Sequence, residues 1–172
     1  MIRGLLDPSR VDQRGLTLVE ILVAVAIIGV AVAGLGIVVP VSLYGVREGN
    51  QLSTATFLAE QVLERARAAA WTATPPVDCL GVSSGDAAPV PAGATCPGGM
   101  ATAFADEDAV TGHPQYRRTV RVASCATTPC AGVTAAGMRL VEVSVSYTPL
   151  TGAGGVSPGP KAVRLAWLVS QK

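Results

Sequence analysis

The sequence predicts an α+β protein in which a long N-terminal helix packs against a small antiparallel sheet. Three observations support this fold class. An uncharged apolar run extends from Ile21 to Val46, and an amphipathic pattern with three- and four-residue steps follows it to about Trp71. The C-terminal third contains three segments in which apolar and polar residues alternate.

The composition excludes several classes of protein. The chain has 172 residues, of which 49% are hydrophobic and 15% are charged, against a typical charged share of about 25%. Disordered chains show the opposite balance. A net charge of +1 also disfavours a general nucleic-acid-binding protein, which would be strongly basic.

The apolar run is long enough to cross a membrane, because a helix needs roughly 20 apolar residues to do so. Three basic residues precede the run, namely Arg3, Arg10 and Arg14. The positive-inside rule therefore predicts a cytoplasmic N-terminus, with the bulk of the chain on the other side of the membrane. Gly36 and Pro40 interrupt the run, and they predict a helix kink because proline removes a helical hydrogen bond.

Residues 47–73 are expected to form an amphipathic helix that ends before the two prolines at positions 75 and 76. Small and branched apolar residues define its buried face, namely Leu52, Ala55, Ala59, Val62, Ala66 and Ala69. Residues 74–113 are rich in proline and glycine and predict loops. Asp106-Glu107-Asp108 lacks the spacing of a calcium loop, so a solvated acidic turn is favoured over a metal site. The single histidine, His113, is interpreted as a loop residue.

All four cysteines follow the apolar run, where an oxidising compartment is expected. Three pairings are possible. We favour Cys79–Cys96 and Cys125–Cys130, because each pair closes a local loop rich in glycine, proline, alanine and threonine. A four-thiolate zinc site is disfavoured, because the chain has no pair of cysteines separated by two residues.

Residues 114–172 contain the three alternating segments, 116–124, 139–147 and 162–169. Each has one apolar face, as expected for an antiparallel sheet that covers a helix. In the first segment the alternation places Arg117 and Arg121 on the polar face, and Arg118 on the other. The two polar-face arginines would form a thin DNA-contacting patch, although a solvated face is the favoured interpretation.

One carboxylate lies at the start of the apolar run. Glu20 follows Leu16-Thr17-Leu18-Val19, and a charged side chain in hydrocarbon costs about 2.5 to 3.5 kcal/mol. Glu20 is therefore a candidate functional residue. The plainer alternative is an interfacial side chain that reaches back to water.

The segment RGLTLVEILVA, residues 14–24, resembles the N-terminus of type IV prepilins, a family that includes the pseudopilins of type II secretion. Leu16 stands where most members carry phenylalanine. The resemblance implies cleavage after Gly15 by the prepilin peptidase and N-methylation of the new amino group on Leu16. It also implies a single-pass inner-membrane precursor with a periplasmic head, which later joins a filament at the cell surface.

The resemblance gives Glu20 a role in assembly, in which it would set the register of subunits in a filament. Cleavage creates an amine at Leu16, four residues from Glu20, and a carboxylate in a low-dielectric core is tolerated when it is paired. The partner would be the Leu16 amine of the same subunit or of a neighbouring one.

The segment LAEQVLERAR, residues 58–67, resembles the minor-pilin branch called type IV pilus modification protein PilV, as do Trp71 and the closing strand. The leading prediction is a structural minor pilin that has no cofactor and no metal, and whose partners are other pilin or minor-pilin subunits. Five segments are expected: leader 1–15, membrane and filament-core helix 16–46, amphipathic helix 47–73, disulfide-stapled loops 74–113 and antiparallel sheet 114–172.

Three alternatives stay open. The chain would be a type II secretion pseudopilin, a DNA-binding competence pilin, or a secreted soluble domain cut after Ala33, since Ala31-Val32-Ala33 before Gly34 looks like a signal-peptidase site. An enzyme is the least expected class, because the sequence has one histidine, no G-x-S-x-G motif and no phosphate-binding loop.

Overall fold

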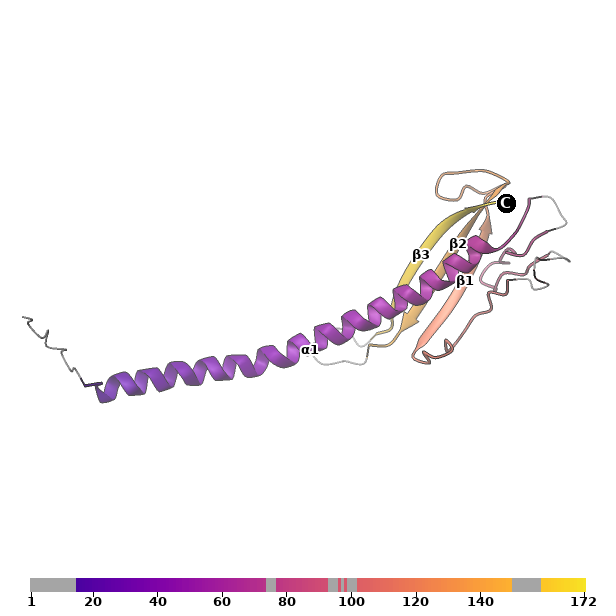
Figure 1. Cartoon of the computed structure of the whole chain (residues 1–172). Helices are drawn as coiled ribbons and strands as arrows, with labels where there is room; N and C mark the ends of the chain where they lie inside the picture. Colours follow the sequence, from indigo (N-terminus) through magenta and orange to yellow (C-terminus); the bar gives the residue numbers. More distant parts are fainter. Residues whose placement is uncertain (1–14, 74–76, 93–95, 97, 99–101, 150–158) are drawn as a thin grey trace, which may run out of the picture. The chain divides into compact units, whose positions relative to one another are not determined.

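The computed structural model describes residues 15–73, 77–92, 96, 98, 102–149 and 159–172 (Figure 1). Its elements are helix α1 (Leu18–Ala68) and strands β1 (Tyr116–Ser124), β2 (Met138–Tyr147) and β3 (Lys161–Ser170). The arrangement is α+β, as predicted. The chain divides into two compact units, Met1–Ser42 and Leu43–Lys172, and α1 contributes to both.

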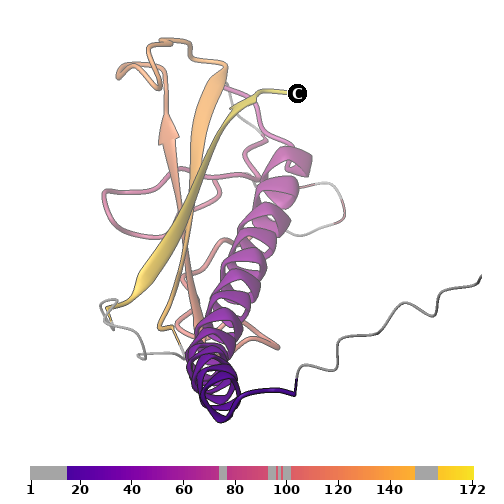
Figure 2. The same cartoon turned by 90° about the vertical axis from the view of Figure 1, so that its left-hand side faces the viewer.

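The strands begin and end within one residue of the predicted segments. They form one antiparallel sheet in the order β1-β2-β3, with β2 between the other two in Figure 1 and the strands on one side of α1 in Figure 2. The register pairs Val120 with Val143, and Val143 with Leu165. Because side chains alternate between the two faces of a strand, this register places the apolar residues of all three strands on one face.

The part of α1 in the second unit covers that apolar face of the sheet. Its buried residues are Ala55, Leu58, Ala59, Val62, Leu63 and Ala66. Val141, Val143 and Val145 of β2 lie opposite them and are fully buried. The helix side of the core is thus built from alanines interleaved with leucine and valine side chains.

Helix α1 ends at Ala68, three residues before the expected end near Trp71. The backbone after Ala68 is hydrogen-bonded to the segment that follows it: Cys79 donates its N–H to the Ala70 carbonyl at 2.9 Å, and Trp71 forms a β-bridge with Asp78. Trp71 is 1% exposed. Burial of its ring together with this local pairing ends the helix before the prolines do.

Strand β3 is less covered than its alternation suggested. Val169 is buried, whereas Val163 and Leu165 are only partly buried. Trp167, which was expected on the covered apolar face, is 47% exposed. An ion pair between Lys161 and Glu48 joins the start of β3 to α1.

Candidate functional site: the N-terminal helix and the arginine anchors of the head

The first unit consists largely of an uncovered apolar helix. Residues Leu18–Gly36 are long and apolar enough to cross a membrane, with a mean hydropathy of 2.7, and no part of this stretch is buried within the chain. Leu18 is 75% exposed and Val30 is 76% exposed. Such a surface is unfavourable in water, so it requires lipid or other protein to cover it.

Thr17 caps the first turn of α1. Its hydroxyl Oγ1 accepts a hydrogen bond from the Glu20 backbone N–H at 3.2 Å, and its carbonyl accepts bonds from Glu20 and Ile21. A threonine followed three residues later by glutamate is the capping-box spacing, and an acidic side chain there also favours the positive end of the helix dipole. The sequence prediction gave Thr17 no separate role, although this spacing was visible in it.

Gly15 and Leu16 lie immediately ahead of this turn and are exposed. A Cβ atom added to Gly15 would meet no atom within 4 Å. Packing in the described structure therefore does not require a glycine at this position, and the role of Gly15 in cleavage stays a prediction. Gly36 and Pro40 both lie within the helical residues of α1, and the kink near them also stays a prediction.

In the head, a row of ion pairs joins the acidic turn to β1. Arg121 contacts Asp106 at 2.7 Å, Arg118 contacts Glu107 at 2.5 Å, and Arg117 contacts Asp108 at 2.9 Å. Glu107 and Arg118 also exchange two backbone hydrogen bonds of 2.9 Å. The turn was expected to be solvated, but the structure shows each of its carboxylates paired with an arginine of β1.

The three pairs differ in burial. The side chains of Arg117 and Asp108 are 61% and 85% exposed, whereas that of Arg118 is 5% exposed. Arg118 also donates to the Leu58 carbonyl at 3.0 Å and to Gln61 Oε1 at 3.2 Å. Arg118 therefore anchors α1 to β1. The hydrogen bond from Arg121 holds the pKa of Asp106 below its usual range and raises the pKa of Arg121.

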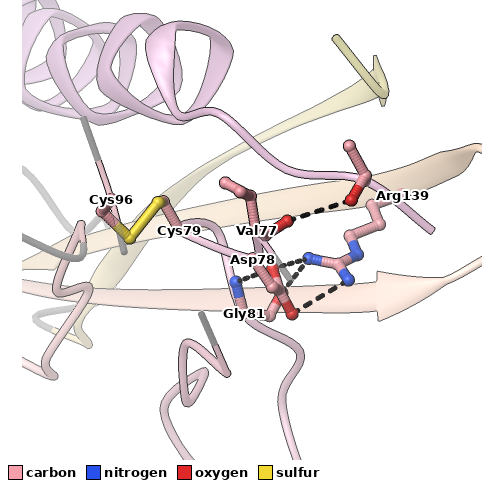
Figure 3. The surroundings of a disulfide bond; sticks show 7 residues. Val77, Asp78, Cys79, Gly81, Cys96 and Arg139 are labelled. Carbon is pink, nitrogen blue, oxygen red and sulfur yellow. Dashed lines mark hydrogen bonds and ion pairs between the residues drawn. A yellow bond between two sulfur atoms is a disulfide. The ribbon is translucent and has the colours of Figure 1, made fainter. Parts of the chain in front are cut away.

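A second buried arginine lies beside the first disulfide (Figure 3). Arg139 bonds both carboxylate oxygens of Asp78, at 2.5 and 3.1 Å, and the Gly81 carbonyl at 3.1 Å, with its guanidinium 4.2 Å from the centre of the Trp71 ring. Burial raises the pKa of Asp78, but the bonds from Arg139 and the Gly81 N–H outweigh it and leave that pKa below its usual range.

The structure contains two disulfides, Cys79–Cys96 and Cys125–Cys130. The first follows Asp78 directly, so it fixes the segment whose carboxylate holds Arg139. The second closes a short loop after β1. No group of three or more histidine, cysteine, aspartate or glutamate side chains suited to a metal ion occurs among the residues that the structure describes.

A scan against protein-family models finds the prokaryotic N-terminal methylation motif at residues 10–36. This match supports a type IV pilin-like protein that the prepilin peptidase processes, anchored in the membrane and then assembled with other pilins. The motif covers the Gly15–Leu16 junction, Glu20 and the exposed apolar part of α1. No curated protein and no solved structure matches the chain significantly.

Proposed function

We propose that the chain is a structural minor pilin, cleaved after Gly15, methylated on Leu16 and assembled through α1 into a type IV pilus or its initiating tip complex. The observation that carries the proposal is the methylation motif at residues 10–36, which coincides with an apolar helix that no described residue covers. Packing of such helices is a heterologous contact, which generates open filaments. The likeness of residues 58–67 to the PilV branch supports the minor-pilin assignment.

Before assembly, the precursor is a single-pass inner-membrane protein with a cytoplasmic N-terminus and a periplasmic head. The basic residues ahead of Gly15 support this orientation. The two disulfides of the head fit an oxidising compartment. The chain's part in the filament is structural, and the chemistry is done on it by the peptidase.

Glu20 is the register residue of this proposal, paired in the filament with the Leu16 amine of its own or a neighbouring subunit. Thr17 supports the role, because its cap orders the first turn, on which Glu20 lies. Substitution of Glu20 should impair assembly more than cleavage. We expect Glu20→Ala to be cut normally at Leu16 and to be strongly depleted from sheared filaments, as measured by mass spectrometry of the N-terminal peptide.

Two control variants sharpen the test. Asp86→Ala removes an exposed carboxylate from a loop of the head and should leave the filament content unchanged. Gly15→Val should block cleavage. Because a Cβ at Gly15 meets open space, loss of cleavage in this variant would reflect impaired recognition by the peptidase rather than impaired folding. Wild-type filament content of Glu20→Ala, or a mature N-terminus at Gly34, would refute the proposal.

A type II secretion pseudopilin is the nearest alternative, because the same motif serves both filaments. Deleting the gene, imaging surface pili and assaying secretion in parallel separates the two. Loss of secretion with intact pili would favour the pseudopilin.

The DNA-binding alternative finds less support. Arg117 and Arg121, the two polar-face arginines, are each paired with an aspartate. Phosphate contacts would have to displace these carboxylates. Retention of the chain on DNA that weakens steeply with salt would favour the alternative, whereas no retention at low salt would exclude it.

A further inference from the structure

The two edges of the sheet differ in how they are covered. On β1, Glu107 exchanges two backbone hydrogen bonds with Arg118, and Ser83 bonds both the N–H and the carbonyl of Val122. On β3, no described residue forms backbone hydrogen bonds to the edge opposite β2. The N–H and C=O groups of this edge are therefore free to pair with another strand, as far as the described chain shows.

The C-terminal part of strand β3 lacks the usual protection of a free edge. Native proteins shorten such strands or place proline and charge on them. β3 has ten residues, and its last six, Leu165–Ser170, carry no charge and no proline. A long apolar edge of this kind marks a site for strand addition.

Grooves border this edge on both faces of the sheet. One, of about 420 Å³, lies between α1 and β3: Leu63, Leu165 and Trp167 form its apolar part, and the charged side chains of α1 that also line it are Glu60, Glu64 and Arg67. The other, of about 370 Å³, lies on the opposite face and is lined by Ala131, Leu140 and Leu168. Both grooves include Ala166 and Trp167.

This pair of grooves matches the geometry of an added strand. Successive side chains of an extended chain point to opposite faces. A strand hydrogen-bonded to β3 would place alternate side chains in the two grooves, and the half-exposed Trp167 would be covered. Arg67, whose guanidinium lies 3.7 Å from the centre of the Trp167 ring, already orients that ring beside α1.

Charge selects the kind of strand that fits. β3 carries Lys161 and Arg164 and no acidic residue. Lys161 is paired with Glu48, whereas Arg164 is exposed and has no ion-pair partner in the described chain. A second copy of β3 has no acidic residue to offer Arg164 in any register, so an acidic strand of a different subunit is favoured.

We propose that the free edge of β3 is a docking site for an extended strand of another protein subunit. That strand has apolar side chains on both faces and an acidic side chain opposite Arg164. The inference rests on the proposed function, because it takes the partner to be a subunit that assembles with this chain. It assigns to the head a contact separate from the packing of the N-terminal helix.

The test places a photo-crosslinking amino acid, p-benzoylphenylalanine, in the full chain expressed in its host. Glu60 reports on the groove beside α1 and Leu168 on the opposite groove, and Ala87 in an exposed loop is the control. We expect both probes to form adducts with a single extended segment of one other subunit, at residues of opposite parity. The control should give no such adduct.

Matched substitutions test the mode of binding. Ala166→Asp puts a charge on the exposed edge and should lower both adducts at least about tenfold, since like charges across an interface are strongly unfavourable. Ala87→Asp, the same change in an exposed loop, should not. If Ala166→Asp lowers the amount of chain, Arg164→Glu replaces it, and a lysine in place of the partner's acidic residue should restore the adducts.

Several outcomes would overturn the inference: adducts no stronger than at Ala87, adducts to lipid or to a second β3, or adducts from the two grooves to different proteins. Filament content and the N-terminal mass are measured in the same cells. Filaments that contain the chain without adducts refute the strand contact alone. Adducts to another subunit in cells whose filaments lack the chain refute the filament role while the strand contact stands.

Discussion

Replacement of Arg118 by methionine should destabilise the head severely, whereas the same change at its neighbour Arg117 should not. Arg118 donates to Glu107 Oε2 at 2.6 Å, to the Leu58 carbonyl at 3.0 Å and to Gln61 Oε1 at 3.2 Å. Methionine keeps the apolar stem of the side chain but removes every donor. The helix and the acidic turn then lose their shared link to β1.

The magnitude follows from burial. Removing one partner of a buried ion pair costs about 3 to 5 kcal/mol. The Arg118 side chain is 5% exposed but that of Glu107 is 32% exposed, so the abandoned carboxylate regains some water and we expect a loss of about 2 to 4 kcal/mol in unfolding free energy. The pair of Arg117 and Asp108 is largely exposed, and such pairs contribute about 0 to 1 kcal/mol.

The assay is urea unfolding of the full chain in detergent micelles, followed by near-ultraviolet circular dichroism. This signal reports on the second unit, because both tryptophans and all tyrosines lie within it. Arg118→Met should lower the urea midpoint strongly, and Arg117→Met should lower it little. Equal losses in the two variants would refute the reasoning, since burial is what distinguishes the two arginines.

Further predictions use the same assay. Opening Cys79–Cys96 by double serine substitution should cost about 3 kcal/mol and opening Cys125–Cys130 about 2 kcal/mol, because the loops close 17 and 5 residues; a reversed order would contradict the loop-entropy argument. Gly81→Ala should cost more than Gly85→Ala: both glycines have positive φ, but only at Gly81 would a Cβ lie 2.6 Å from backbone. Folding lowers the pKa of Asp78, so the stability that its ionised carboxylate contributes is present above about pH 4 and is lost as the pH falls further. Asp78→Asn should therefore make the unfolding free energy less dependent on pH in this acid range. An unchanged slope of unfolding free energy against pH would refute this prediction.

The strands were predictable from the sequence because their alternation is strong. In β2, residues 141–146 alternate regularly between valines on the buried face and polar residues on the other face. Even the burial of Arg118 follows from alternation, which places it on the apolar face of β1. The alternation could not identify its partners, because Leu58 and Gln61 lie on a helix some sixty residues away along the chain.

The acidic turn shows which contacts could not be predicted from the sequence. Asp106, Glu107 and Asp108 form a charge run, and such runs are usually solvated. The structure pairs them with three arginines in antiparallel order. Complementary sign was visible in the sequence, but the pairing depends on a backbone bridge between Glu107 and Arg118 that closes only when the loop folds back on β1.

Two uncovered apolar surfaces in the described part of the chain differ in how they can be recognised. Leu18–Gly36 is evident from hydropathy alone, because nineteen residues with a mean hydropathy of 2.7 cannot be hidden in a small head. The edge at Trp167 has no such signature, since an alternating apolar strand is equally typical of a covered core strand. Only the sheet order makes β3 an edge, and the hydrogen bonds of Glu107 and Ser83 to the backbone of β1 show that the opposite edge is closed. In the proposed assembly, the N-terminal helix therefore specifies that the chain assembles, and the edge of β3 specifies with which subunit.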